Sequence, residues 1–512
     1  MGDARDTEMN APGATRVRRC AHPSRWLHRG RWLGWRLART AFVSAAAAVS
    51  GCASWVTATP MLPTISVPAG WSAADAAGAG ADGVTVTSLT DWWQRFDDPL
   101  MADLVGRALL ANTSVVSAQA ALRQAQALRD VAAAGLLPTL GASASAQRGK
   151  AGGQSTGNRV QLGLDGQWVP DVFGARRDAL DAGDAVAAAS ATSLGDARVQ
   201  VAASVASSYI LLRSVQARWA IANDNLASQQ DTLQITEWRQ QAGLVGALEV
   251  DQARAAAAQT RALLPALQTS IDQTAHALAV LVGQPPAALQ AELSIPPTTA
   301  PAAVPFANGE LVLNIPADAL RQRADVRGAE FQVAAALARV GQAQAQRWPS
   351  FAIGGSLGLS AVSAAALTNG ASVVSSLLAS VSLPLFDGGA ARAQVRAQQA
   401  ALDAAQQSYR AAVLGALKDV ESALVALRGD RLRLASLRVA TDAATSAATL
   451  ARQRYSSGLV DYQTVLETQR NQLSTQDGVV NASADVGSDQ VRLFTALGGG
   501  WRMDDPQQAA TR

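Results

Sequence analysis

The fold of this chain is decided by residues 387–455, which read DGGAARAQVRAQQAALDAAQQSYRAAVLGALKDVESALVALRGDRLRLASLRVATDAATSAATLARQRY. The stretch contains no proline and is rich in alanine, glutamine, arginine and leucine, which are strong helix formers. Its apolar residues recur at the spacing of one packed helix face: Leu402, Tyr409, Val413, Leu417, Val420, Leu424 and Leu427. At 1.5 Å per residue the predicted helix is roughly 100 Å long, which favours a coiled coil or a helical tunnel.

A second stretch, residues 174–241, has the same character and shows that the chain is a duplication. Similar phrases precede the two stretches, PDVFG at 170–174 and PLFDG at 384–388. Similar turns follow them, RQQAGLV at 239–245 and RYSSGLV at 454–460. The repeat is far longer than that of a solenoid, so we expect one elongated body built from two internal repeats.

The composition argues against a large globular core and against nucleic-acid binding. Charged residues make up 16% of the 512 residues and aromatic residues 5%. The first 51 residues hold nine arginines and three acids, which leaves 34 basic and 37 acidic residues in the rest of the chain. Because the body is not basic, its charge gives no reason to expect a nucleic-acid partner.

The N-terminal residues have the pattern of a secretory leader. An arginine-rich start is followed by a short apolar run at 41–51, which is too short to span a bilayer. The run closes with VSGC at 49–52, which resembles a bacterial lipoprotein box and implies cleavage before Cys52 and acylation of its sulfur. A buried free cysteine is the alternative. The absence of aspartate just after Cys52 favours the outer membrane over the inner one in lipoproteins.

Four short segments alternate between apolar and polar residues. They lie at about 138–148, 159–169, 350–361 and 373–385, two in each repeat. Strands of this length with one apolar and one polar face are typical of transmembrane β-barrel hairpins. Four strands cannot close a barrel, and an open edge cannot lie in lipid. Two copies would give eight strands with a filled interior and three would give twelve with a lumen, and the serine- and glycine-rich inner faces favour three.

The predicted fold is therefore a mixed α/β membrane protein: a trimeric twelve-stranded β-barrel, with four strands per chain, continued by a long α-helical barrel. Shorter helices at about 98–136, 247–283, 316–346 and 461–497 match each long helix in combined length. The predicted parts are a signal peptide (1–51), a lipid-anchored tether (52–91), a first repeat (92–285), a connector at the equator (286–315), a second repeat (316–501) and a C-terminal tail (502–512).

Several motifs in combination resemble the TolC-like outer-membrane factor family, in its lipoprotein, NodT-type branch. They are FDDPL at 96–100, DVFG at 171–174, LRQRADVR at 320–327, PLFDGG at 384–389, and RY at 454–455 followed by SG at 457–458 and LE at 466–467. The resemblance covers about 92–501. One departure is Ala324, where the family usually has proline, and it is expected to loosen that helix start.

The resemblance implies a homotrimer that lies in the outer membrane and extends into the periplasm. It implies a periplasmic adaptor protein and an inner-membrane RND pump as partners. The expected function is a passive duct that exports small molecules in a tripartite efflux system. An exit duct for type I protein secretion and a lipid-tethered periplasmic coiled-coil protein remain as alternatives.

The resemblance also suggests functional residues. Tyr455 and Glu467 stand where the family places a gating tyrosine and carboxylate, although Glu467 has the alternative of an ordinary solvated acid on a helix. The two hairpin tips are expected to dock the adaptor, and they comprise Gly243, Leu244, Val245, Gly458, Leu459 and Val460. The alternative for the tips is ordinary helix-end packing around a C′ glycine.

A catalytic function is not expected. GGSLG at 354–358 matches the G-x-S-x-G nucleophile pattern, but that motif needs a strand-to-helix turn and a base. Here the strand alternation continues through Ser356, and His276 is the single histidine after residue 51. We expect no cofactor or metal, and no bound group other than the lipid on Cys52.

Overall fold

The computed structural model describes residues 62, 65–68, 70–71, 89–150, 156–294, 303–307 and 320–502. The chain divides into two units, residues 1–59 and 60–512, and every described residue belongs to the second. The predicted signal peptide and Cys52 lie outside the described residues, as do most of the predicted tether and connector and nearly all of the tail.

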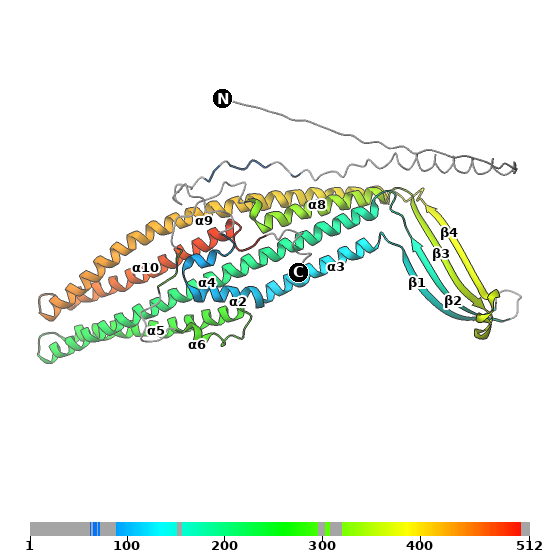
Figure 1. The fold of residues 1–512 in the computed structure, drawn as a ribbon. Coiled ribbons are helices and arrows are strands. Elements are labelled where there is room, and N and C mark those ends of the chain that lie inside the picture. The colour runs from blue at the N-terminus through cyan, green and yellow to red at the C-terminus, as the bar shows by residue number, and fades with distance from the viewer. Residues whose placement is uncertain are drawn as a thin grey trace, which may run out of the picture. The chain divides into compact units, whose positions relative to one another are not determined.

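The described elements are helices and four strands, and Figure 1 labels them. In chain order they are the 3₁₀ helix η3 Trp92–Phe96, α2 Pro99–Ala111, α3 Thr113–Ala134, β1 Thr139–Gly149, β2 Gly157–Trp168, α4 Ala175–Gln241, α5 Ala247–Leu281, α6 Gln290–Leu293, α8 Ala324–Ala345, β3 Ser350–Ala361, the 3₁₀ helices η4 Ala364–Thr368 and η5 Gly370–Ser372, β4 Val373–Ser382, α9 Ala390–Ser456 and α10 Tyr462–Ala496.

The four strands form one antiparallel sheet in the order β1-β2-β3-β4. The two hairpins come from different repeats, and β2 joins β3 with Leu162 opposite Leu359 and Leu164 opposite Leu357. Successive residues of a strand face opposite sides, so this register gathers leucines on one face. Polar groups gather on the other, where Ser143 donates to Asp165 at 3.1 Å and Ser356 shares a 2.8 Å hydrogen bond with Ser376. Strands β1 and β4 are the edges.

The helices α4 and α9 have 67 residues each, or about 100 Å at the usual rise. Each long helix packs against shorter ones: α4 against α2, α3, α5 and α8, and α9 against α8 and α10 (Figure 1). Helix α10 also packs against α4, which joins the hairpin α4–α5 to the hairpin α9–α10. One long helix with shorter partners in each repeat is the arrangement that the sequence predicted.

The helix predicted over about 98–136 is broken into α2 and α3 at Asn112. The Asn112 side chain accepts a 2.8 Å hydrogen bond from the Ser114 amide, as an N-cap does, and its own amide donates to the Leu281 carbonyl at 2.7 Å. The predicted cap at the start of α2 is present, because Asp98 accepts from the Met101 amide at 3.0 Å. The prediction of a single helix was wrong because the apolar spacing runs on across the break.

The repeated phrases before the long helices are helix caps. Asp171 accepts from the amides of Arg176 and Arg177 at 3.1 and 2.9 Å at the start of α4. Asp387 accepts from the amides of Gly389 and Ala391, both at 2.8 Å, at the start of α9. The hydrogen bonds from Ala391 and then Gly389 lower the pKa of Asp387, because they stabilise its charged form. Both long helices therefore begin with an aspartate side chain that caps the amides of their first turn.

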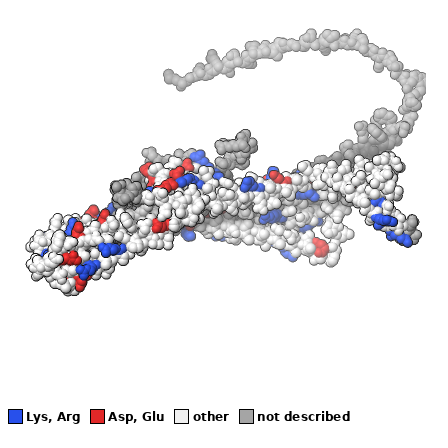
Figure 2. Space-filling model, turned by 90° about the horizontal axis from the view of Figure 1, so that it is seen from below, with Lys and Arg blue, Asp and Glu red and all other residues white. Residues whose placement is uncertain are grey.

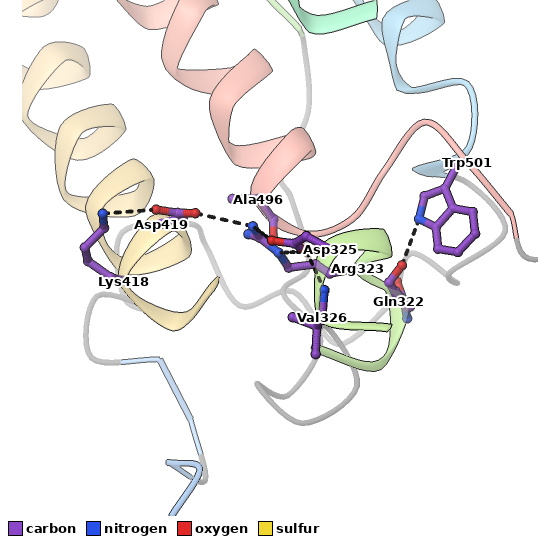
Figure 3. A network of polar contacts seen from close by, with 8 residues as sticks. All are labelled: Gln322, Arg323, Asp325, Val326, Lys418, Asp419, Ala496 and Trp501. Carbon is purple, nitrogen blue, oxygen red and sulfur yellow. Dashed lines mark hydrogen bonds and ion pairs between the residues drawn. The ribbon is translucent and has the colours of Figure 1, made fainter. Parts of the chain in front are cut away.

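Arg323 joins three helices at their junction (Figure 3). Its side chain pairs with Asp325 of α8 at 2.7 Å and with Asp419 of α9 at 3.3 Å, and it donates to the Ala496 carbonyl at the end of α10 at 3.0 Å. Burial alone would raise the pKa of Asp325, but the hydrogen bond and charge of Arg323 outweigh it and lower that pKa. Arg323 is the N-cap residue of α8, so the helix begins at Ala324.

The described helices include none that is long and apolar enough to cross a membrane.

Candidate functional site

Tyr455 lies at the contact between the two hairpins, near their free ends. Its side chain is 1% exposed, and its hydroxyl shares a 3.0 Å hydrogen bond with the Thr236 hydroxyl of α4. Because Thr236 already donates to the Thr232 carbonyl at 2.8 Å, the Tyr455 hydroxyl is the donor in this pair. The Tyr462 ring packs edge-on against Tyr455 from α10, with centroids 5.9 Å apart. Tyr455 therefore links α9 to α4 across the hairpins.

Arg239 makes a second link at the same place. Its guanidinium lies 4.7 Å from the centre of the Tyr455 ring and donates a hydrogen bond to the Tyr455 carbonyl. A cation over an aromatic face is attracted by the ring's electron density, and burial strengthens the attraction. Thr236 and Arg239 were not predicted as partners of Tyr455. The one signal was that Arg239 occupies in the first repeat the position of Arg454 in the second.

Glu467 has different surroundings from Tyr455. It lies on an exposed part of α10, where its carboxylate accepts a 3.1 Å hydrogen bond from Gln463 one turn earlier. Within a single copy, the structure does not bring the two predicted gate residues together. A role for Glu467 therefore depends on what faces that surface of α10 in an assembly.

Polar pairs continue along the contact of the two hairpins. They are Arg218 with Asp477 at 3.1 Å, Asn225 with Gln476 at 2.9 Å, Ser228 with Arg452 at 3.1 Å and Thr232 with Gln469 at 3.2 Å. We call these pairs, together with Thr236–Tyr455, the inter-hairpin seam. Hydrogen bonds between side chains contribute only about 1 kcal/mol each, because water competes for the same groups. Apolar side chains of both hairpins also pack together at this contact, among them Ala253, Ala451 and Val465.

The two hairpin tips have the same backbone geometry. Gly243 and Gly458 have left-handed φ values of 72° and 75°. The amides of Leu244 and Leu459 each bond 2.8 Å to a carbonyl five residues back, which is the Schellman motif of a helix end. The leucine side chains are nevertheless 68% and 74% exposed, so the helix end does not cover them.

The G-x-S-x-G match does not form a nucleophile site. Residues 354–358 lie inside β3, which continues to Ala361 without the strand-to-helix turn that the motif needs. Among the described residues, no group of three or more histidine, cysteine, aspartate and glutamate side chains could hold a metal ion.

The chain has a four-stranded sheet with open edges and one apolar face, together with two repeats of long helices. This is the architecture of an outer-membrane channel. The profile of the Outer membrane efflux protein family matches residues 104–284 and 315–499. The chain therefore belongs to that family, and it functions as an efflux channel of the outer membrane.

Individual proteins agree with the family. The chain is 32% identical to Nodulation protein T of Rhizobium leguminosarum bv. viciae, over 83% of this chain and 88% of that protein. It is 30% identical to the Pyoverdine export outer membrane protein OpmQ of Pseudomonas aeruginosa, over 90% of this chain and 97% of that protein. The solved outer-membrane channel OprN superposes with a TM-score of 0.78 at 33% identity, over 86% of this chain and all of that one. These findings confirm the predicted family and fold class.

Proposed function

We propose that three copies of the chain form one barrel of twelve strands, with the polar face of the sheet lining a water-filled lumen. The edges β1 and β4 each pair on one side only within the chain, and their free backbone groups need partners in lipid. Pairing β4 of one copy with β1 of the next satisfies both edges. Three copies give a barrel wide enough for a lumen, which two copies do not.

The duct serves a tripartite RND-type efflux system. A periplasmic adaptor protein and an inner-membrane RND pump are its partners, and small molecules are its cargo. The name of one relative supports this cargo, because pyoverdine export is what that protein does. The duct performs no chemical reaction, and the pump supplies the energy. Its lipid anchor is attached at Cys52.

The seam around Tyr455 holds the periplasmic end of the duct closed at rest. Buried hydrogen bonds from Tyr455 and Arg239 to facing groups support this role. Glu467 of three copies would form an acidic ring on the exposed side of α10, which favours cations in transit. A Glu467→Ala variant is expected to change the closed-state conductance, and an unchanged conductance would remove the gate role of this residue.

The exposed leucines at the two tips support adaptor docking at 242–245 and 457–460. A Leu459→Glu variant puts a charge into an apolar contact and is expected to abolish crosslinking to the adaptor. Leu110→Glu is the matched control and is expected to leave the crosslinking intact. Leu110 is also exposed, at 82%, but lies in α2 away from the tips. Crosslinking that survives in Leu459→Glu would contradict docking at this tip.

The open-edged sheet carries the proposal, and single-channel conductance of the detergent-purified protein in a planar bilayer tests it. Small gated current steps are expected. Absence of conductance, with extraction from cells that needs no detergent, would instead favour the lipid-tethered coiled-coil protein. Loss of a secreted protein from the medium on deletion, with unchanged susceptibility to small toxic compounds, would favour the type I secretion duct.

A further inference from the structure

Aromatic side chains mark the end of the sheet that is nearest the helices. Phe173 stacks on Trp348 with centroids 5.6 Å apart and on Phe351 at 6.3 Å. The indole of Trp168, at the end of β2, donates to the Leu136 carbonyl at 3.0 Å. Aromatic residues of this kind collect at the boundary between lipid tails and headgroups. They place the inner boundary of the membrane at this end of the sheet.

The opposite end of the sheet carries positive charge only. Arg148 is the second-last residue of β1, Lys150 follows that strand, and Arg159 is near the start of β2; all three are exposed. The sequence holds no acid over 131–164 and no charged residue at all over 348–386. Figure 2 shows Lys and Arg side chains, in blue, at the right-hand tip of the view, with no acid beside them.

The strand register separates the three cations by face. Arg148 has the parity of Leu140 and the other apolar residues of β1, and it pairs with Asn158. Arg159 pairs with Gln147 and has the parity of Asp165, so it lies on the polar face. In the barrel, Arg148 therefore points outward toward lipid and Arg159 points into the lumen.

The height of Arg148 above the aromatic end matches the membrane. Arg148 lies nine positions after Thr139 along β1. These positions span about 30 Å along the strand, and a strand tilt of roughly 40° reduces this to about 23 Å. The apolar band of such barrels is about 25 Å tall, so Arg148 lies where the outer headgroups begin.

We propose that Arg148 and Lys150 bind the phosphate groups of a phosphorylated lipid in the outer leaflet, which rests on the membrane placement of the sheet in the proposed function. The guanidinium matches phosphate geometry with two parallel donors, and Lys150 adds a second charge. A lipid fits better than free phosphate, because its chains pack on the apolar face directly below Arg148, which includes Ala146 and Leu162.

Native mass spectrometry of the full-length, detergent-purified protein tests the proposal, with lipid A as the phosphorylated probe and phosphatidylcholine and inorganic phosphate as comparisons. Wild type is expected to bind lipid A in preference to both. The double variant R148Q/K150Q is expected to lose roughly thirtyfold in lipid A affinity, because each cation near an anionic surface contributes to binding. The variant R148K/K150R keeps both charges and is expected to retain most of it.

Arg159→Gln is the control for the face of the sheet, because it removes one positive charge at the same end of the sheet but on the lumen face. It is expected to change lipid A affinity by less than about twofold. Equal losses in R159Q and R148Q/K150Q would contradict the proposal, and so would inorganic phosphate that displaces lipid A. Conductance of the same preparations separates the two ideas: channels without lipid A preference overturn this inference alone, whereas no channels in wild type overturns the proposed function.

Discussion

At the scale of single residues, Tyr455 links the two helical hairpins near their periplasmic ends. It donates one buried hydrogen bond to Thr236 and receives the Arg239 cation on its ring. Both partners lie in α4, whereas Tyr455 lies in α9. The tyrosine can therefore stabilise the contact between the two hairpins through a buried side chain.

A Tyr455→Phe variant keeps the ring and removes the hydroxyl donor. The closed contact should lose about 1 kcal/mol, which raises the ratio of open to closed channels about fivefold. Single-channel open probability measures the change. Tyr462→Phe is the control, because Tyr462 packs on Tyr455 from within the same hairpin. Identical open probabilities for wild type and Tyr455→Phe would show that the seam does not close the duct.

Asp489 is expected to make the free energy of unfolding depend on pH. The residue is 1% exposed in α10 and accepts from Arg492 at 2.9 Å. Burial, and after it the neighbouring carboxyl group of Asp430 in α9, raises the pKa of Asp489 to about 6. The folded chain thus holds this proton more tightly than the unfolded chain does, so the free energy of unfolding falls as pH rises from about 4 to 6.

Asp489→Asn removes this titration. The melting temperature of the variant should change less with pH over that interval than that of wild type. The matched control is Asp485→Asn, which removes an exposed carboxylate that pairs with Arg433 on the same two helices. A pH profile for Asp489→Asn parallel to that of wild type would refute the assignment.

At the scale of elements, the junction of α8, α9 and α10 depends on Arg323. Its side chain is 12% exposed, and its single guanidinium pairs with Asp325 of α8 and with Asp419 of α9. Arg323→Gln should lower the free energy of unfolding by about 2 kcal/mol, because it leaves a charged partner and the end of α10 without their donor. Thermal melting of the detergent-solubilised protein measures this loss.

Lys418→Gln is the control for the junction. Lys418 also pairs with Asp419, at 3.5 Å, but is 74% exposed, so its loss should cost less than about 0.5 kcal/mol. Equal melting temperatures in the two variants would mean that Arg323 is only a surface charge.

The sequence predicted these elements well where one periodicity dominates. The alternation of residues such as Leu162 and Leu164 predicted a strand, and the register confirms that they share a face. The break at Asn112 was missed because a helix cap involves only a few residues, whereas the apolar spacing of the helix runs on across them. The bond between Thr236 and Tyr455 was missed for another reason: it depends on how α4 and α9 meet, and no local pattern records a contact between residues so far apart in the chain.

At the scale of the whole molecule, the chain is incomplete alone. Its sheet leaves β1 and β4 unpaired on one side, which a membrane does not tolerate. Helix α9 also exposes apolar residues spaced by seven or eleven positions, as a helix does that meets another copy: Leu414, Val425, Leu432, Val439 and Leu450. The open sheet edges and the exposed apolar face of α9 are therefore both expected to contact neighbouring copies of the chain.

The number of chains in the detergent-solubilised, full-length particle is the measurement that tests this account most directly. Light scattering, corrected for bound detergent, gives the protein mass. Closure of the barrel by three sets of four strands predicts three times the mass of the processed chain. A particle that holds one or two chains would leave the barrel open or without a lumen, and would contradict the account.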